Sequence, residues 1–477
     1  MNAPLIANVL GWLLVGISAI QLVPIAAAFG FGEPVLPYAA SAIGACVVGL
    51  TVALSSHPEH RRMRSRDAFL VVSAAWLTAS AFGALPYVFT ETFGVVDAIF
   101  ESVAGFTTTG STVMTQIEGA PRALLLWRSL TQWLGGMGII LFAVALMPLL
   151  GVGGMQLFKA EVPGPVADKL SPRVAVTARR LWLIYVGFTG VEWVLLFAAG
   201  MSGYDALCHS FTTMSTGGFS TLDGSIGGFE SPLIEWIIIV FMVLAGVNFV
   251  LHYRLLTGRI GSALRDAELR YYLVLLGAAA IIVYLALVEA IHAGGFRAAL
   301  FQVVSITTTT GYTSVNFEGW PAIALLVLLQ AMILGGMAGS TSGGVKSLRV
   351  LIGIKAVSSL FERLGHRTAV GHPVRYEGKR VPNEVLAGIW AFLTAYFVTV
   401  AIVACVVAAA GYDILTSLSA ALTSVGNVGP GLGEIGPFDN FAHFPSAIKL
   451  TLCFAMIAGR LELFTILILF HRDFWRR

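Results

Sequence analysis

The sequence predicts an all-α integral membrane protein, with a fourfold pseudo-symmetric repeat of helix–pore helix–filter loop–helix around a central pore, plus an N-terminal two-helix hairpin. The chain of 477 residues is 57% hydrophobic and only 12% charged, which excludes an ordinary soluble protein. A stretch rich in threonine and glycine, closed by a glycine, occurs four times at intervals of 108, 93 and 118 residues. The closing glycines are Gly110, Gly218, Gly311 and Gly429.

The N-terminal hairpin is predicted from two apolar runs, 4–29 and 38–55, joined by a turn that contains glycine and proline. No Lys or Arg precedes the first run, and the first basic residue is Arg61, so the positively charged start of a signal peptide is missing. We therefore expect residues 1–64 to form an uncleaved transmembrane hairpin that carries no copy of the repeated stretch.

Each repeat is expected to contain an apolar span, a short apolar segment and a second apolar span. Spans of roughly 20 residues can cross a bilayer, whereas segments of 11 to 14 residues suit re-entrant helices. The four pore repeats are predicted at 65–178, 179–266, 267–381 and 382–477. Three short segments start near an aspartate, which we interpret as an N-cap. These aspartates are not in register, because Asp97 and Asp205 lie 13 residues before their closing glycines and Asp413 lies 16.

The second spans share a pattern of leucine or isoleucine followed by two small residues. Its copies are at 134–137, 244–247, 334–337 and 457–460. The last residue is apolar in three copies and is Arg460 in the fourth. An arginine at the bilayer centre costs roughly 2.5–3.5 kcal/mol, so it usually faces a protein interior or a wet cavity. For Arg460 the alternatives are a position facing such a cavity and a structural ion pair with Glu192 or Glu289.

The distribution of basic residues predicts the orientation in the membrane. The segments on one side are 57–66, 151–180, 254–270, 346–380 and 471–477. They hold 24 of the 29 Lys and Arg residues, and the positive-inside rule assigns such segments to the cytoplasm. We therefore expect cytoplasmic N- and C-termini and filter stretches that enter the membrane from the outer face.

The four uncharged stretches are interpreted as a potassium-binding filter. Irregular backbone at membrane depth is tolerated only when it is buried or lines a water-filled path, and rings of carbonyls can replace the hydration shell of potassium. The predicted filter residues are Thr108, Thr109, Gly110, Thr216, Gly217, Gly218, Thr309, Thr310, Gly311, Asn427, Val428 and Gly429. For a single copy, close helix packing by small residues is the better interpretation, but four matched copies favour the filter.

A second glycine-rich segment lies inside the second span of the third repeat. Its glycines are Gly335, Gly336, Gly339, Gly343 and Gly344, followed by Lys346. Because glycine destabilises helices, we expect the helix to break here. Close packing of small residues is the alternative explanation.

Several of these motifs together resemble the TrkH/TrkG potassium-uptake subunits of the Trk/Ktr/HKT superfamily, from about residue 65 to the end. They are Thr-Thr-Thr-Gly-Ser at 107–111, Trp-Arg-Ser-Leu-Thr-Gln-Trp-Leu-Gly-Gly-Met-Gly-Ile at 127–139, Ser-Thr-Gly-Gly-Phe-Ser at 215–220, the glycine-rich segment at 335–346, Asn-Val-Gly-Pro-Gly at 427–431 and Gly-Arg-Leu-Glu at 459–462. The N-terminal hairpin is similar to the Trk branch rather than the shorter Ktr branch.

The resemblance implies potassium uptake across the bacterial cytoplasmic (inner) membrane by a homodimer in which each protomer has its own pore. It implies a cytosolic nucleotide-binding ring subunit of the TrkA type as the gating partner. It also implies that the glycine-rich segment with Lys346 and Arg460 forms the gate, and that serine at the position of Gly110 marks sodium-preferring relatives. The expected cargo is K+ and the expected surroundings are membrane lipid, with no organic cofactor and no nucleic acid.

Two other classes of function compete with a channel-like uptake protein. A proton- or sodium-coupled symporter should bury titratable groups beside the substrate path, and the four filter stretches contain none. A membrane enzyme should show a catalytic constellation, and the sequence shows none, so we do not expect an enzyme. Coupling to a proton or sodium gradient stays the alternative.

Overall fold

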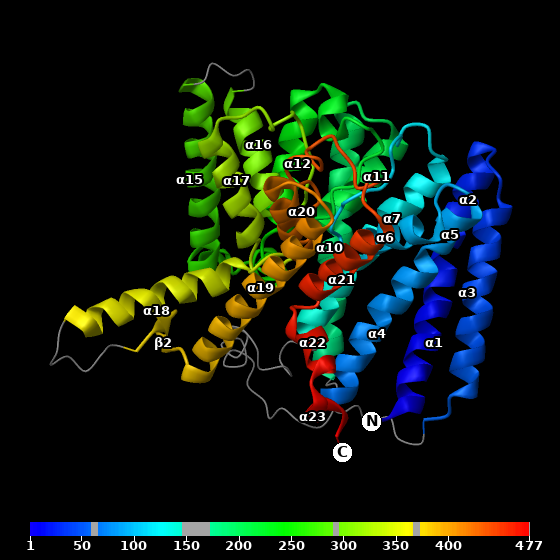
Figure 1. The fold of residues 1–477 in the computed structure, drawn as a ribbon, viewed down its shortest axis with the longest axis horizontal. Coiled ribbons are helices and arrows are strands. Elements are labelled where there is room, and N and C mark those ends of the chain that lie inside the picture. The colour runs from blue at the N-terminus through cyan, green and yellow to red at the C-terminus, as the bar shows by residue number, and fades with distance from the viewer. Residues whose placement is uncertain (59–64, 146–171, 290–294, 366–372, 477) are drawn as a thin grey trace.

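The computed structural model describes residues 1–58, 65–145, 172–289, 295–365 and 373–476 (Figure 1). Within these residues, six helices are long and apolar enough to cross a membrane, or eight if each of two sharply bent helix pairs counts as one span. The strands of the described residues are β1 (Arg375–Tyr376) and β2 (Lys379–Arg380), an antiparallel pair with Arg375 opposite Arg380. The predicted all-α integral membrane fold is confirmed.

The N-terminal hairpin consists of α1 (Ala3–Ile20), α2 (Leu22–Phe31) and α3 (Leu36–Ser55). Helices α1 and α3 lie side by side because each has a glycine at the crossing point. A β-carbon on Gly11 would lie 2.6 Å from the Ala53 nitrogen, and one on Gly49 would lie 2.8 Å from the Gly11 oxygen. Small residues let backbones approach closely in membranes, where packing holds helices together.

The four repeats follow the hairpin in chain order. The first contains α4 (Ser65–Gly83), α5 (Leu85–Phe89), α6 (Val95–Phe106) and α7 (Arg122–Ala145). The second contains α10 (Pro172–Ala198), α11 (Gly203–Met214), η1 (Ser225–Phe229), α12 (Pro232–Ala245), α13 (Phe249–Leu256) and α14 (Ile260–Leu264). The third contains α15 (Ala267–Glu289), α16 (Gly295–Thr307), α17 (Ala322–Leu334) and α18 (Ser347–Gly365). The fourth contains α19 (Asn383–Ala409), α20 (Ile414–Gly426), α21 (Ser446–Arg460), α22 (Phe464–Leu467), η2 (Ile468–Phe470) and α23 (Arg472–Trp475).

The short helices α6, α11, α16 and α20 are the four pore helices, and their packing closes a ring. Each contacts the second span of its own repeat and the second span of the preceding repeat. Helix α11 packs on α12 and α7, α16 packs on α17 and α12, and α20 packs on α21 and α17. Helix α6 packs on α7 and on α21, so the fourth repeat closes on the first. This cyclic order is the fourfold pseudo-symmetry that the sequence predicted, whereas the boundaries assigned to the hairpin and to each repeat stay predictions.

The N-caps of the pore helices correct the interpretation of two aspartates. Asp413 caps α20 as expected, since its carboxylate accepts hydrogen bonds from the Leu415 and Thr416 nitrogens. The N-cap of α6 is Gly94 and that of α11 is Ser202, so Asp97 and Asp205 are third residues of their helices and the N-cap prediction is wrong for both. Each of the three N-caps lies 16 residues before its closing glycine, which explains the apparent mismatch in register.

The second spans of three repeats are interrupted near the aligned glycines. Helices α12 and α13 meet at 100°, and α21 meets the following segment, Phe464–Phe470, at 109°. Helices α17 and α18 are separated by residues 335–346, where the break was predicted. The apolar second spans of the second and fourth repeats are therefore not continuous helices. In the second repeat, backbone groups at the turn bond to the glycine-rich interruption, since the Met337 nitrogen donates to the Gly246 carbonyl and the Phe249 nitrogen donates to the Gly339 carbonyl.

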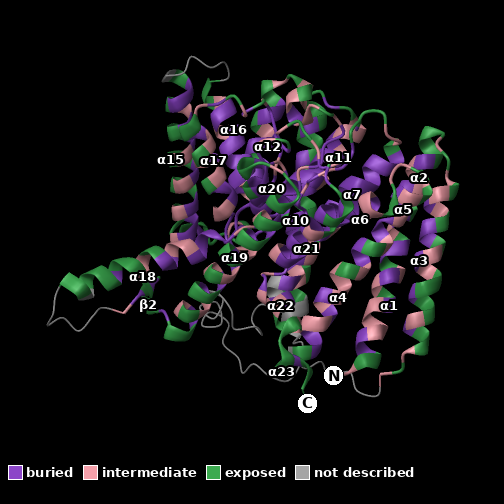
Figure 2. Cartoon of the chain, in the orientation of Figure 1, coloured by how far each residue is buried: buried purple, intermediate pink, exposed green. Residues whose placement is uncertain are grey.

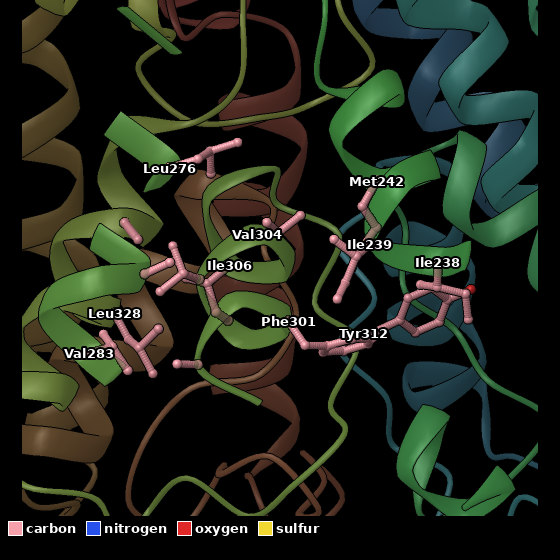
Figure 3. Close-up of a cluster of buried hydrophobic side chains, with 14 of the residues drawn as sticks. Ile238, Ile239, Met242, Leu276, Val283, Phe301, Val304, Ile306, Tyr312 and Leu328 are labelled. Atoms are coloured by element: carbon pink, nitrogen blue, oxygen red, sulfur yellow. The ribbon is translucent and has the colours of Figure 1, made fainter. Parts of the chain in front are cut away.

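Burial follows the ring, with buried residues concentrated around the pore helices and exposed residues on the outer helices (Figure 2). Large apolar side chains are exposed on α3, α10, α15 and α19, as expected for surfaces that face lipid. Around α16, Phe301, Val304 and Ile306 lie among apolar side chains of neighbouring helices (Figure 3). Because lipid tails are as apolar as these side chains, close packing rather than removal from water holds this cluster together.

The two ends of the described chain lie at the same end of the molecule (Figure 1). Helix α18 leaves the bundle at the level of the interruptions and extends away from it, and α19 returns along a diagonal path. The β1–β2 hairpin lies beneath α18. The predicted basic segment 346–380 thus begins at the glycine-rich interruption, and its described parts, α18 and the β1–β2 hairpin, lie outside the helical ring.

Candidate filter and intramembrane loop

The backbone of the four filter stretches has the same unusual conformation in every repeat. The residue two places before the closing glycine has a positive φ, and so does the glycine. These torsions are 52° and 81° in the first repeat, 53° and 76° in the second, 58° and 81° in the third, and 55° and 112° in the fourth. The non-glycine residues are Thr108, Thr216, Thr309 and Asn427. A left-handed conformation costs such a residue roughly 1–2 kcal/mol, so its fourfold repetition marks a site that surrounding contacts enforce.

The closing glycines bring the four stretches together around one axis. A β-carbon built on Gly110 would collide with the Gly217 carbonyl oxygen of the second repeat. A β-carbon built on Gly218 would lie closest to the Thr310 carbonyl oxygen, one on Gly311 to the Val428 carbonyl oxygen, and one on Gly429 to the Thr109 carbonyl oxygen. In each case the carbonyl belongs to the next repeat in the ring. The four stretches therefore form a closed ring in which each glycine faces backbone of its neighbour. Sequence reasoning predicted twelve filter residues, and the structure brings all four stretches together.

Hydrogen bonds of threonine hydroxyls stabilise the filter stretches. The Thr107 and Thr109 hydroxyls lie 2.7 Å apart, and those of Thr308 and Thr310 lie 2.8 Å apart. Asn427 donates from Nδ2 to the Thr109 hydroxyl at 2.9 Å, which joins the fourth stretch to the first. These hydrogen bonds are buried, so they hold the left-handed residues in place at low dielectric.

Polar side chains on three pore helices brace the chain just after the filter. Glu101, His209 and Gln302 each lie nine residues before the closing glycine of their repeat. Glu101 accepts a hydrogen bond from the Val113 nitrogen at 2.9 Å, and the His209 Nε2 lies 3.0 Å from the Ser220 hydroxyl. Gln302 donates to the Ser314 hydroxyl at 3.3 Å. The pore helices thus position the chain that leaves the filter as well as the chain that enters it.

An ion pair within the first repeat, which sequence reasoning missed, also contacts the second repeat through its arginine. Arg128 on α7 donates from Nε to Glu101 at 2.6 Å and from Nη1 to the Ser220 carbonyl at 2.9 Å. Its guanidinium carbon lies 3.5 Å from the centre of the Phe219 ring, next to the closing Gly218. Both partners are almost fully buried, and removing one partner of such a pair is strongly destabilising. The feature of the sequence that could have indicated this pair is that Glu101 and Arg128, of opposite charge, both lie in apolar segments of the first repeat.

The glycine-rich loop 335–346 lies against the ring of filter stretches. The Gly343 nitrogen donates to the Thr309 hydroxyl at 2.6 Å, so the loop contacts a filter residue directly. The Gly344 nitrogen donates to the Gly426 carbonyl at the end of pore helix α20, at 2.9 Å. The Met337 nitrogen donates to the carbonyl of Gly246 in the interruption of the second repeat, also at 2.9 Å. The loop therefore bonds to backbone or side chains of three repeats.

The five glycines of this loop are also closely packed, as the alternative interpretation expected. Gly335, Gly339 and Gly344 have φ values of 72°, 79° and 71°, which favour glycine. A β-carbon on Gly343 would collide with the Gly426 carbonyl, and one on Gly336 would lie 2.9 Å from the Gly246 carbonyl. The glycines thus both interrupt the helix and allow close contact.

Charged residues at the ends of the loop anchor it. Glu268, buried at the start of α15, accepts hydrogen bonds from the Ala338 nitrogen at 2.7 Å and the Ser347 hydroxyl at 2.8 Å. Lys346 donates to the Ser342 carbonyl. Arg349, on the first turn of α18, pairs with Glu462 in the interruption of the fourth repeat. The first turn of α18 is therefore tied to the chain below the filter.

Arg460 ends α21 and is 3% exposed. Its Nη1 donates to the Thr341 carbonyl of the loop at 2.7 Å. Among the described residues Arg460 forms no ion pair, and the Glu192 carboxylate has none either. The side chain of Glu289, the other suggested partner, lies outside the described residues. The contact places Arg460 against the loop 335–346, which contains its aligned position in the third repeat, Met337.

Four re-entrant helices that close into a ring, with glycine-closed stretches between them, define this molecule as a membrane transport protein. The chain belongs to the TrkH family of cation transport proteins, which matches residues 39–476. The resemblance inferred from the filter and loop motifs is thus confirmed.

Similar proteins cover nearly the whole chain. It is 40% identical over 440 residues to the Trk system potassium uptake protein TrkH of Escherichia coli K12, covering 91% of this chain and 90% of that protein. It is 38% identical over 487 residues to the Trk system potassium uptake protein TrkH of Halomonas elongata, covering 100% of both. The crystal structure of the potassium transporter TrkH from Vibrio parahaemolyticus superposes with a TM-score of 0.92 at 34% identity, again covering 100% of both chains.

Proposed function

We propose that this protein carries potassium ions into the cell across the bacterial cytoplasmic membrane through a carbonyl-lined selectivity filter. The observation that carries this proposal is the closed ring of glycines, each opposed to a backbone carbonyl of the next repeat. Such carbonyl rings can replace the hydration shell of potassium. The relatives named as potassium uptake proteins support the same cargo.

The filter residues act through their backbone in this proposal. In an extended strand successive carbonyls point to opposite sides, whereas alternating left-handed and ordinary torsions bring them to one side. Each stretch follows directly on the C-terminal end of a pore helix, where the helix dipole is partly negative and stabilises a cation. The ion is therefore held by dipoles and by no full charge, which allows it to leave again.

The loop 335–346 and Arg460 form the gate below the filter in the proposed mechanism. The hydrogen bonds to Thr309, Gly426 and Gly246 support a closed arrangement in which the loop occupies the inner mouth. The charge of Arg460 adds an electrostatic barrier, since two unit charges 4 Å apart repel by about 4 kcal/mol at an effective dielectric constant of 20. Opening requires the loop to leave these partners.

The gating partner is proposed to be a cytosolic nucleotide-binding ring of the TrkA type. Helix α18 begins where the loop ends and extends away from the bundle, so a partner that moves α18 would pull on the loop (Figure 1). The ion pair of Arg349 with Glu462 would resist that movement. In this proposal the protein is a homodimer embedded in lipid, each protomer has its own pore, and both termini are cytoplasmic.

A second candidate function is proton-coupled symport, which Glu192 favours. This glutamate lies on α10, is fully buried and has no ion-pair partner among the described residues. Buried ionisable groups in membrane helices often carry protons in transporters. Glu192→Gln should abolish a pH dependence of uptake if coupling occurs and leave uptake unchanged if the protein conducts passively.

The test of the proposed function is ion flux into vesicles that contain the purified protein. Potassium uptake should exceed sodium uptake, and addition of a nucleotide-loaded ring partner should change the rate. Equal potassium and sodium fluxes would overturn the filter assignment. A potassium flux that is driven against its own gradient by an imposed pH gradient would establish symport in place of passive conduction.

A further inference from the structure

The second filter stretch departs from the other three at one position. The residue before the closing glycine is β-branched in the first, third and fourth stretches, as Thr109, Thr310 and Val428, but is Gly217 in the second. Gly217 is not among the glycines with a positive φ, so its backbone conformation is open to any residue. A reason other than backbone freedom must therefore account for glycine at this position.

Gln132 of α7 occupies the space that a side chain at Gly217 would need. A β-carbon on Gly217 would collide with the side-chain amide of Gln132 and would lie 2.8 Å from its Nε2. Gln132 is fully buried and uses both ends of its amide on the second filter stretch. Its Nε2 donates to the Gly217 carbonyl at 2.6 Å, and its Oε1 accepts from the Phe219 nitrogen at 3.0 Å. The amide thus spans the closing Gly218.

The first and third stretches achieve a comparable constraint with their own residues. In each of these stretches, the threonine three residues before the closing glycine and the threonine one residue before it have hydroxyls no more than 2.8 Å apart. In the second stretch these positions are Ser215 and Gly217, so the second hydroxyl is missing. Gln132 supplies a hydrogen-bonding group at the same place from the neighbouring repeat.

We propose that Gln132 is a positioning residue that sets ion discrimination by fixing the Gly217 carbonyl in the filter ring. This inference rests on the proposed potassium filter. The Gly217 carbonyl is also the group that faces Gly110, so it is part of the ring. Ion preference in a carbonyl filter depends on how many carbonyls coordinate the ion and how freely they move. A Gly217 carbonyl released from Gln132 can move toward a smaller ion such as sodium.

The aligned second spans offer a replacement that keeps the volume and removes the hydrogen bonds. Met242 and Met332 stand at the positions that correspond to Gln132 in the second and third repeats. Gln132→Met should therefore fold and lower the potassium-to-sodium flux ratio about tenfold, the factor that corresponds to loss of the buried hydrogen bond that fixes the Gly217 carbonyl. The matched control is Ser129→Ala on the same helix, because the Ser129 hydroxyl donates to the Leu125 carbonyl of its own helix.

A compensating pair tests the geometry directly. Gly217→Thr alone should disrupt the filter by collision with Gln132, whereas Gln132→Ala with Gly217→Thr should recover discrimination relative to Gln132→Ala alone. In the double variant the new threonine hydroxyl can pair with Ser215, as in the first and third stretches. Both fluxes are measured in vesicles, per amount of folded protein.

The outcomes separate this inference from the function on which it rests. An unmodified protein without potassium preference overturns the proposed function. An unmodified protein with potassium preference, combined with an unchanged ratio in Gln132→Met, overturns the role of Gln132 alone. An equal loss in Ser129→Ala, or a double variant no better than Gln132→Ala, also overturns it. A lowered ratio in Gln132→Met with recovery in the double variant supports it.

Discussion

Replacing each closing glycine in turn with serine tests how much that glycine contributes to ion discrimination by the ring. Serine at Gly110 must adopt a φ of 81°, which costs an L-residue roughly 1–2 kcal/mol. Its β-carbon must also displace the Gly217 carbonyl, and overpacking of this kind costs roughly 1–3 kcal/mol. Because a difference of about 1.4 kcal/mol between the potassium-bound and sodium-bound states is a factor of ten, we expect Gly110→Ser to lower the flux ratio at least about tenfold.

The four closing glycines differ in the space around a built β-carbon, so the prediction ranks the four variants. At Gly429 the nearest atom to a built β-carbon is the Thr109 carbonyl oxygen at 2.9 Å, whereas the other three closing glycines leave less room. A positive φ strains serine at all four positions, so the contact distance decides the order and Gly429→Ser should have the smallest effect on the flux ratio. Gly119→Ser is the control, because nothing lies within 4 Å of a β-carbon at this glycine in the loop after the first filter stretch.

The assay is potassium and sodium flux into vesicles, normalised to folded protein, with thermal unfolding measured beside it. The expected order is a large loss of discrimination for Gly110, Gly218 and Gly311, a smaller loss for Gly429 and none for Gly119. The reasoning is refuted if Gly110→Ser discriminates as well as Gly119→Ser. It is also refuted if Gly429→Ser is the most severe of the four.

Three further predictions concern the gate and the support of the filter. Arg460→Ala should raise basal potassium flux by roughly tenfold if the charge adds about 1.4 kcal/mol to the barrier, with an unchanged ion preference; a joint fall in folded yield and flux would indicate a structural role instead. Glu268→Gln should raise basal flux, because a neutral amide accepts weaker hydrogen bonds from the Ala338 nitrogen and the Ser347 hydroxyl than the Glu268 carboxylate does; unchanged flux would show that this anchor does not restrain the loop. Glu101→Gln should lower stability by about 3–5 kcal/mol, measured as a fall in Tm, since it leaves Arg128 buried without a countercharge. Adding Arg128→Met should restore part of that stability, and a Tm equal to that of the unmodified protein in the single variant would contradict the argument.

The amino-acid sequence by itself determined the features that depend on spacing along the chain. The intervals between closing glycines predicted four repeats, and the segment lengths before them predicted re-entrant helices. The glycines at 335–344 predicted the interrupted helix, because local backbone preference governs such breaks. Position in the repeat aligned Arg460 with Met337, and the structure places its guanidinium on the Thr341 carbonyl of the loop that contains Met337.

The tertiary structure alone decided which groups that are distant in the chain meet, within a repeat and between repeats. The 100° bend between α12 and α13 lies where Gly246 and Phe249 bond to the glycine-rich interruption of the third repeat, far along the chain. Glu101 and Arg128 are separated by 27 residues, and Gln132 and Gly217 by 85. A single sequence shows only that a charge or an amide lies in an apolar segment. Its partner is set by how each repeat folds and how the four repeats pack into a ring, which the order of residues does not show.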